Sequence, residues 1–151
     1  MAQRGLIFRA LVASPSDCMH ERKLIPEVIS EWNAVHSYST AAVIEPVLWE
    51  THSRPDLAGR PQAIINKQLV ANCDLVIGAF WTRLGTPTGE SVSGTAEEIE
   101  QFRAAGKPVL LYFSSAPVVP EGLDATQYAA LTEYRRSGLP PSIRTLPLGA
   151  F

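Results

Sequence analysis

The sequence predicts an α/β fold, in which one parallel sheet is buried between two layers of helices. Apolar runs rich in β-forming residues alternate along the chain with segments of helical periodicity, and this alternation is typical of such folds. The run 74–80 (Asp-Leu-Val-Ile-Gly-Ala-Phe) is apolar after its first residue, as expected of a central strand with both faces covered. We therefore expect this run to lie in the middle of the sheet.

Length and composition predict a single domain over residues 1–151, of which 139–151 form a poorly defined tail. Apolar residues make up 46% of the chain and charged residues 19%, as in ordinary globular proteins. The formal net charge of −2 favours neither nucleic acid nor an anionic membrane as a partner. Two cysteines cannot build a disulfide framework, so we expect a cytoplasmic protein. No apolar run approaches the ~18–20 residues of a membrane span, and Arg9 interrupts the run that could resemble an export signal.

The first expected elements are a strand over 6–13 and a helix after the turn Ser14-Pro-Ser-Asp17. Ser16 or Asp17 is expected to cap this helix through its side-chain oxygen. Pro26 lies inside the helix and is expected to kink it or to mark a second start. The apolar face of the helix repeats at three and four residues and comprises Leu24, Ile25, Val28, Ile29 and Trp32.

The second strand is expected over 41–49, and Pro46 within it cannot donate to a ladder, which predicts an edge strand. A polar loop over 51–59 follows, and then a helix from Pro61 to Asn72, with Asn72 as a left-handed stop. An edge position for the second strand favours the flavodoxin-like strand order 2-1-3-4-5. The remaining expected elements are a strand over 74–80, a helix over 95–105 that stops at Gly106, a strand over 108–113, a helix over 123–136 and a short strand over 142–146.

In this strand order the ligand-binding switch point lies between the first and third strands. Their carboxyl ends carry Ser14-Pro-Ser-Asp17 and Phe80-Trp-Thr-Arg83, so these segments are expected to face one cleft. Ser14, Ser16 and Asp17 form one lip of this cleft in the prediction, although capping of the first helix explains them as well. No metal site is expected, because the histidines and cysteines share no ligand spacing.

Glu98 is the leading candidate for chemistry, since it follows the third strand at the start of a helix. A carboxylate there could hydrogen-bond ribose hydroxyls or stabilise an oxocarbenium-like centre. The alternative is structural, because Thr95-Ala-Glu-Glu98 matches a capping box in which Thr95 caps the helix and Glu98 reaches back. The neighbouring Glu97 could simply complement the helix dipole.

Two further residues after the third strand have open roles at this point. Trp81 could stack a nicotinamide or adenine ring, but packing in the core explains an aromatic residue equally well. Arg83 could bind phosphates or pair with Glu90 or Glu97. The segment 85–89 contains glycines but lacks the lysine of a phosphate-binding loop, so it adds little.

Several segments together resemble a bacterial TIR-like domain, in a branch that also resembles a domain family of unknown function in prokaryotic signalling and defence proteins. The resemblance covers roughly residues 5–115, and the blocks 80–89 and 93–98 are its most specific parts. The matching segments are Val12-Ala-Ser-Pro-Ser-Asp17 with Glu21-Arg22, Arg60-Pro-Gln62, Cys73-Asp-Leu-Val-Ile77, Phe80-Trp-Thr-Arg-Leu-Gly-Thr-Pro-Thr-Gly89 and Ser93-Gly-Thr-Ala-Glu-Glu98.

This resemblance implies a flavodoxin-like fold and an NAD glycohydrolase or cyclase that cleaves the nicotinamide–ribose bond, with Glu98 as the catalytic residue. NAD is then a substrate, and no cofactor is implied. The loop 50–59 corresponds to the segment through which TIR domains self-assemble, in antiviral defence or signalling. The implied substrate-binding residues are Ser14, Ser16, Trp49, Phe80, Trp81, Arg83 and Leu84.

Two alternatives stay open beside this implication. The pattern Ser93-Gly-Thr-x-x-Glu98 also resembles nucleoside 2-deoxyribosyltransferases, which cleave a related N-glycosidic bond through a glutamate nucleophile. A non-catalytic TIR-like interaction module is the other alternative, in which Glu98 only caps its helix.

Overall fold

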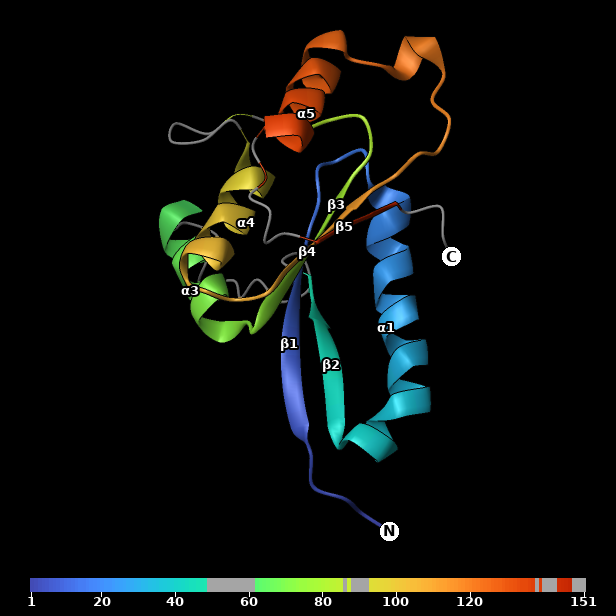
Figure 1. Cartoon of the computed structure of the whole chain (residues 1–151), viewed down its shortest axis with the longest axis vertical. Coiled ribbons are helices and arrows are strands. Elements are labelled where there is room, and N and C mark those ends of the chain that lie inside the picture. The colour runs from blue at the N-terminus through green and yellow to red at the C-terminus, as the bar shows by residue number, and fades with distance from the viewer. Residues whose placement is uncertain (49–61, 86, 88–92, 138, 140–143, 148–151) are drawn as a thin grey trace.

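A computed structural model of the chain describes residues 1–48, 62–85, 87, 93–137, 139 and 144–147. Five parallel strands form one sheet in the order β2-β1-β3-β4-β5 (Figure 1), which confirms the predicted α/β fold and its flavodoxin-like strand order. The edge position of the second strand is confirmed as well. The strands are β1 (Leu6–Ala13), β2 (Ala42–Val47), β3 (Leu75–Phe80), β4 (Val109–Phe113) and β5 (Arg144–Pro147).

Helices cover both faces of this sheet. The chain passes from β1 to β2 on one side of β1, whereas β3, β4 and β5 follow one another on its other side. Because crossovers between parallel strands are right-handed, the helices of these two kinds of connection lie on opposite faces of the sheet. Among the described helices, α1 lies on one face, whereas α3 and α4 lie on the other (Figure 1). The helical elements are α1 (Met19–Thr40), α3 (Gln62–Asn72), α4 (Gly94–Ala104), the 3₁₀ turn η2 (Pro120–Gly122) and α5 (Ala125–Ser137).

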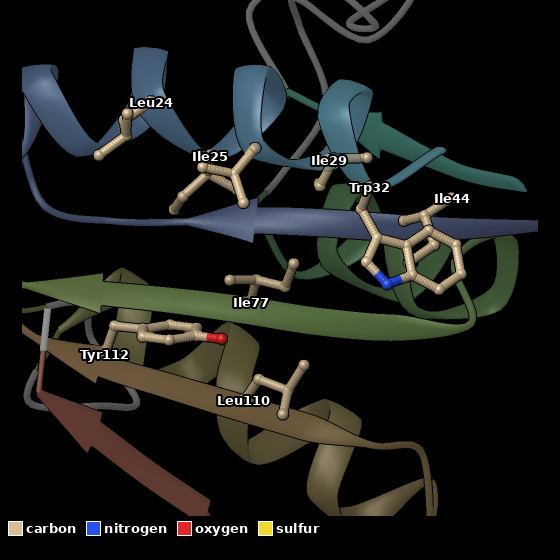
Figure 2. Close-up of a pocket in the computed structure, with 9 residues that line it drawn as sticks. Leu24, Ile25, Ile29, Trp32, Ile44, Ile77, Leu110 and Tyr112 are labelled. Atoms are coloured by element: carbon tan, nitrogen blue, oxygen red, sulfur yellow. The ribbon is translucent and has the colours of Figure 1, made fainter. Parts of the chain in front are cut away.

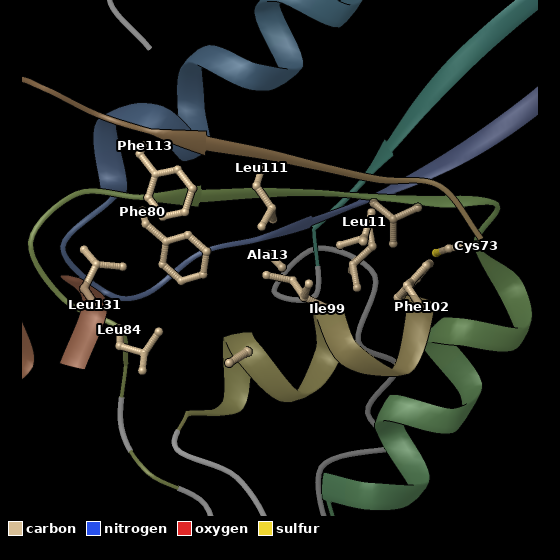
Figure 3. Close-up of a cluster of buried hydrophobic side chains, with 13 residues drawn as sticks. Leu11, Ala13, Cys73, Phe80, Leu84, Ile99, Phe102, Leu111, Phe113 and Leu131 are labelled. Carbon is tan, nitrogen blue, oxygen red and sulfur yellow. The ribbon is translucent and has the colours of Figure 1, made fainter. Parts of the chain in front are cut away.

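The larger core lies between the sheet and α4 (Figure 3). Phe80 and Phe113, at the ends of β3 and β4, stack with ring centroids 5.5 Å apart. Gly78 lets α4 approach β3 closely, since a Cβ there would lie 2.6 Å from Leu111 and 3.0 Å from Ile99. This cluster contains the buried residues Leu11, Ala13, Val47, Cys73, Val76, Phe80, Leu84, Ala96, Ile99, Phe102, Leu111, Phe113 and Leu131.

The opposite face has a smaller buried cluster of Ala10, Ile29 and Ile77. Beside α1 this face holds an open apolar groove of about 300 Å³, which runs over β3 and β4 (Figure 2). The groove is lined by Leu24, Ile25, Val28, Ile29, Trp32, Ile44, Ile77, Leu110 and Tyr112. The two faces of the sheet are therefore covered unequally by the described residues.

The ends of two helices differ from the sequence's predictions. The N-cap of α1 is Cys18, without a side-chain cap, and the helix continues through Pro26, so the expected second start is wrong. The left-handed residue is Ala41, with a φ of 52°, at the end of α1. Asn72, the expected left-handed stop, is instead the last residue of α3. Gly106 does end α4 as expected, with a φ of 71°.

No helix in the described parts of the chain has the length and apolar character needed to cross a membrane.

Candidate functional site

Asp17 ties the loop after β1 to the end of β3. Its Oδ2 accepts hydrogen bonds from the backbone amide of Thr82 (3.0 Å) and from the Thr82 hydroxyl (2.8 Å). The expectation that Ser16 or Asp17 caps α1 is therefore wrong, because the Asp17 carboxylate is used across the switch point instead. This link brings together the two segments that the strand order predicts to share one cleft.

The serines of the same loop differ in their surroundings. Ser14 is half-buried, and its Oγ accepts a hydrogen bond from Nη1 of Arg22 in the first turns of α1 (3.1 Å). Ser16 is exposed. Arg22 thus holds Ser14 in place at the end of β1, whereas the Ser16 side chain is exposed to solvent.

Ser93 caps α4 in the position where Thr95 was expected to do so. Its backbone is extended (φ −162°, ψ 154°), its side chain is fully buried, and its Oγ accepts the amide of Ala96 at 2.9 Å. Because Ser93 is the N-cap, the capping-box position three residues later is Ala96 and not Glu98. The predicted capping box from Thr95 to Glu98 is therefore wrong, and Glu98 lies a further half-turn into the helix, half-buried, beside the core residue Ile99.

Trp81 and Arg83, after β3, both contact the segment that follows β4. The Trp81 indole Nε1 donates to the carbonyl of Ala116 at 2.8 Å. The Arg83 guanidinium forms an ion pair with Asp124 at 3.7 Å. Glu90, one of the two partners suggested by the sequence, lies outside the described residues. Trp81 and Arg83 thus hold the loop after β4 against the end of β3.

The other expected substrate-binding residues lie elsewhere. Phe80 and Leu84 are 0% and 2% exposed and belong to the larger core (Figure 3), so their described contacts are packing contacts. Trp49 and the loop 50–59 lie outside the described residues.

A cleft of about 520 Å³ opens at the carboxyl ends of β3 and β4, between the loop after β4 and α5. Of the residues that the sequence predicted to form the site, Trp81 lines this cleft. The cleft is not lined by Ser14, Ser16, Arg83 or Glu98. Thr82 belongs to the segment 80–83 that was expected to face a cleft, whereas the lining residues from β4, the loop after it and α5 were not expected from the sequence. For those on α5, the spacing of three and four residues was the available signal. The lining residues are Trp81, Thr82, Phe113, Ser114, Ser115, Ala116, Val118, Leu123, Tyr128, Leu131, Thr132 and Arg135.

Neither cysteine is suited to nucleophilic chemistry. Burial raises the pKa of the Cys18 thiol well above its usual range, and the nearby charges of Asp17 and Glu21 add to this effect. Burial also raises the pKa of the Cys73 thiol. Both thiols are free, and they stay protonated near neutral pH. Within the described ranges, no three His, Cys, Asp or Glu side chains are grouped as metal ligands would be.

These features define a parallel α/β protein of flavodoxin-like strand order, with polar side chains gathered at the carboxyl edge of its sheet. More particularly, the chain belongs to the family described as Domain of unknown function (DUF4062), which matches residues 13–136. The match begins at the end of β1 and extends into α5, and so it includes the Asp17–Thr82 link, Glu98 and the cleft. No curated protein matches the chain.

Proposed function

We propose that this protein cleaves an N-glycosidic bond of a nucleotide, with NAD as the substrate and Glu98 as the catalytic carboxylate. The observation that carries the proposal is the cap of α4. Since Ser93 already satisfies the amide of Ala96, the start of α4 does not need Glu98 as a capping-box partner. The capping box is thereby removed as the explanation for a glutamate at this position.

The proposed chemistry suits a carboxylate at the carboxyl edge of a parallel sheet. In NAD the bond between the ribose C1′ and the nicotinamide nitrogen breaks, and its electron pair leaves with neutral nicotinamide. Positive charge then develops on the ribose ring, and an anionic side chain near C1′ stabilises it. Water adds to C1′ and releases one proton, which gives ADP-ribose.

The Asp17–Thr82 link supports the same site, because it holds the β1 loop beside the end of β3, where nucleotides bind in sheets of this order. Ser14, fixed by Arg22, is then the hydroxyl on the β1 side of the substrate. Self-association through the loop 50–59, a cytoplasmic location and a role in defence or signalling belong to the same proposal.

The test is incubation of the purified protein with NAD over a range of protein concentrations, with chromatography of nicotinamide and ADP-ribose. We expect Glu98→Gln to lower nicotinamide release by at least about 100-fold, by analogy with the loss of other groups that stabilise transition-state charge. The matched control is Glu97→Gln, which removes the adjacent carboxylate of the same helix and is expected to retain turnover. Equal turnover by Glu98→Gln and the unmodified protein contradicts the role of Glu98, and no turnover of NAD at any concentration contradicts the substrate.

A second candidate is a nucleoside 2-deoxyribosyltransferase-like enzyme, which the Ser93-Gly-Thr-x-x-Glu98 pattern favours. Deoxynucleosides added to the same assay separate the two candidates, because this enzyme cleaves them and leaves NAD intact. Loss of their cleavage in Glu98→Gln would assign the residue to this reaction. If neither class of substrate is cleaved, the non-catalytic module is favoured.

A further inference from the structure

The cleft between β3, β4 and α5 has walls that are held by contacts from three segments. Trp81 fixes the loop after β4 through Ala116, at 2.8 Å. The amide of Gly85 donates to the side-chain oxygen of Gln127 on α5, at 3.0 Å. Arg83 pairs with Asp124 just before the same helix. The walls of the cleft are therefore held by the protein's own contacts, as expected of a small-molecule site that is largely preformed.

Arg135 gives the cleft a positive charge. Its guanidinium carbon lies 4.8 Å from the centroid of the Phe113 ring, over the ring face. Within the described residues, no carboxylate pairs with Arg135, and none is among the residues that line the cleft. The next residue on the helix, Arg136, differs in this respect, because it pairs with Glu133 at 2.5 Å. The guanidinium of Arg135 is therefore a positive charge in the cleft that no described carboxylate neutralises.

The remaining lining groups combine aromatic rings, hydroxyls and an apolar floor. Phe113 and Leu131 form the floor and are 5% and 4% exposed. Tyr128 exposes 48% of its surface, and in the described structure its hydroxyl and that of Ser115 have no protein partner. Trp81 adds an indole that is half-buried and held at its Nε1 edge. Flat rings beside a guanidinium suit a planar aromatic molecule with an anionic group.

We propose that this cleft is a second ligand site, which binds a small phosphorylated nucleoside independently of Glu98. Arg135 holds the phosphate, and the base lies against Trp81 and Tyr128. The volume of about 520 Å³ falls within the ~300–1,000 Å³ of small-molecule sites. Neither Glu98 nor Ser14 lines this cleft, so the proposal concerns binding and does not depend on turnover.

The test is isothermal titration of the full chain with AMP, together with adenosine and inorganic phosphate as partial ligands. We expect Arg135→Ala to weaken AMP binding by about tenfold or more, as for the loss of one charge-assisted phosphate contact. Arg136→Ala is the matched control, since it removes the next charge on α5 outside the cleft, and it is expected to change the affinity less than about twofold. Trp81→Ala is expected to weaken AMP more than inorganic phosphate.

Glu98→Gln is expected to bind AMP with unchanged affinity, which separates this proposal from the proposed reaction. Equal affinities of Arg135→Ala and Arg136→Ala for AMP would overturn the role of the cleft, as would the absence of AMP binding at millimolar concentration. Equal affinities for AMP and inorganic phosphate would overturn the nucleoside assignment. Circular dichroism of each variant verifies that the fold is retained.

Discussion

Ser93 is a fully buried serine whose hydroxyl oxygen accepts the amide of Ala96 in the first turn of α4. Its neighbourhood is tight: a Cβ added to Gly85, which has a φ of 115°, would lie 3.2 Å from the Cβ of Ser93, so the glycine leaves room for Ser93 beside the loop after β3. One side chain therefore satisfies the helix start while the loop from β3 packs against it. A helix has one N-cap residue, and in α4 this residue is Ser93. Thr95 therefore cannot be the cap, and Glu98 cannot be its capping-box partner.

The first prediction concerns this cap. Ser93→Ala is expected to lower the free energy of unfolding by about 0.5–2 kcal/mol, since the amide of Ala96 loses its acceptor. Thr95→Ala is the control, and it is expected to cost clearly less, because Thr95 is inside the helix. Urea unfolding followed by circular dichroism gives both values. A larger loss in Thr95→Ala than in Ser93→Ala would restore the capping box from Thr95 to Glu98.

Local patterns in the sequence predicted several element ends correctly, but they could not show contacts between residues that lie far apart in the sequence. The strand Leu6–Ala13 has the predicted bounds, and Gly106 ends its helix as predicted. Asp17 and Thr82 are 65 positions apart, so no local pattern shows that the carboxylate bonds across the sheet edge instead of capping α1. Arg135 was missed for the same reason, because only the folded chain brings it over Phe113.

At the scale of the elements, α3 is held at its carboxyl end by a residue from outside the helix. Lys107, just before β4, donates from Nζ to the carbonyl of Cys73 at 2.7 Å and to the carbonyl of Val70. These groups belong to the unpaired carbonyls that every helix end leaves, and a cation there also complements the helix dipole. Asn72 was expected to end this helix by its own conformation, and the contact from Lys107 explains why it need not do so.

The second prediction tests this contact between elements. Lys107→Met keeps the apolar stem of the side chain and removes the ammonium group, and we expect a loss of about 1–3 kcal/mol in the free energy of unfolding. Arg103→Met is the control, since it breaks only the exposed pair with Glu100, and a much smaller loss is expected. Equal losses in the two variants would show that the Lys107 contact does not hold α3.

At the scale of the whole molecule, the sheet is unevenly supported along its strands. Figure 1 shows β1, β2 and α1 extending together toward the N-terminal end of the molecule. Ala10 and Leu11 pair with both β2 and β3, and Val12 and Ala13 pair with β3, whereas the register of Leu6–Phe8 is with β2 alone. Leu6 and Ile7 are 65% and 67% exposed, while Ala10–Ala13 are buried. The alternation of strands and helices, with Pro46 marking an edge strand, predicted the order of this sheet, but it could not predict how far each strand pair extends.

This gradient leads to the last prediction, on amide hydrogen exchange measured by NMR. Local opening free energies rise with burial and with pairing on both sides. The amides of Ala10–Ala13 are therefore expected to exchange at least about 100-fold more slowly than those of Leu6–Phe8, which can open without breaking the pairing between β1 and β3. The amides of Val76–Ala79, in the buried centre of β3, are the internal reference for full protection. Equal protection along the whole of β1 would contradict this gradient. The exposed apolar residues at the start of the strand would then have to be covered in solution by a surface that the described residues do not provide.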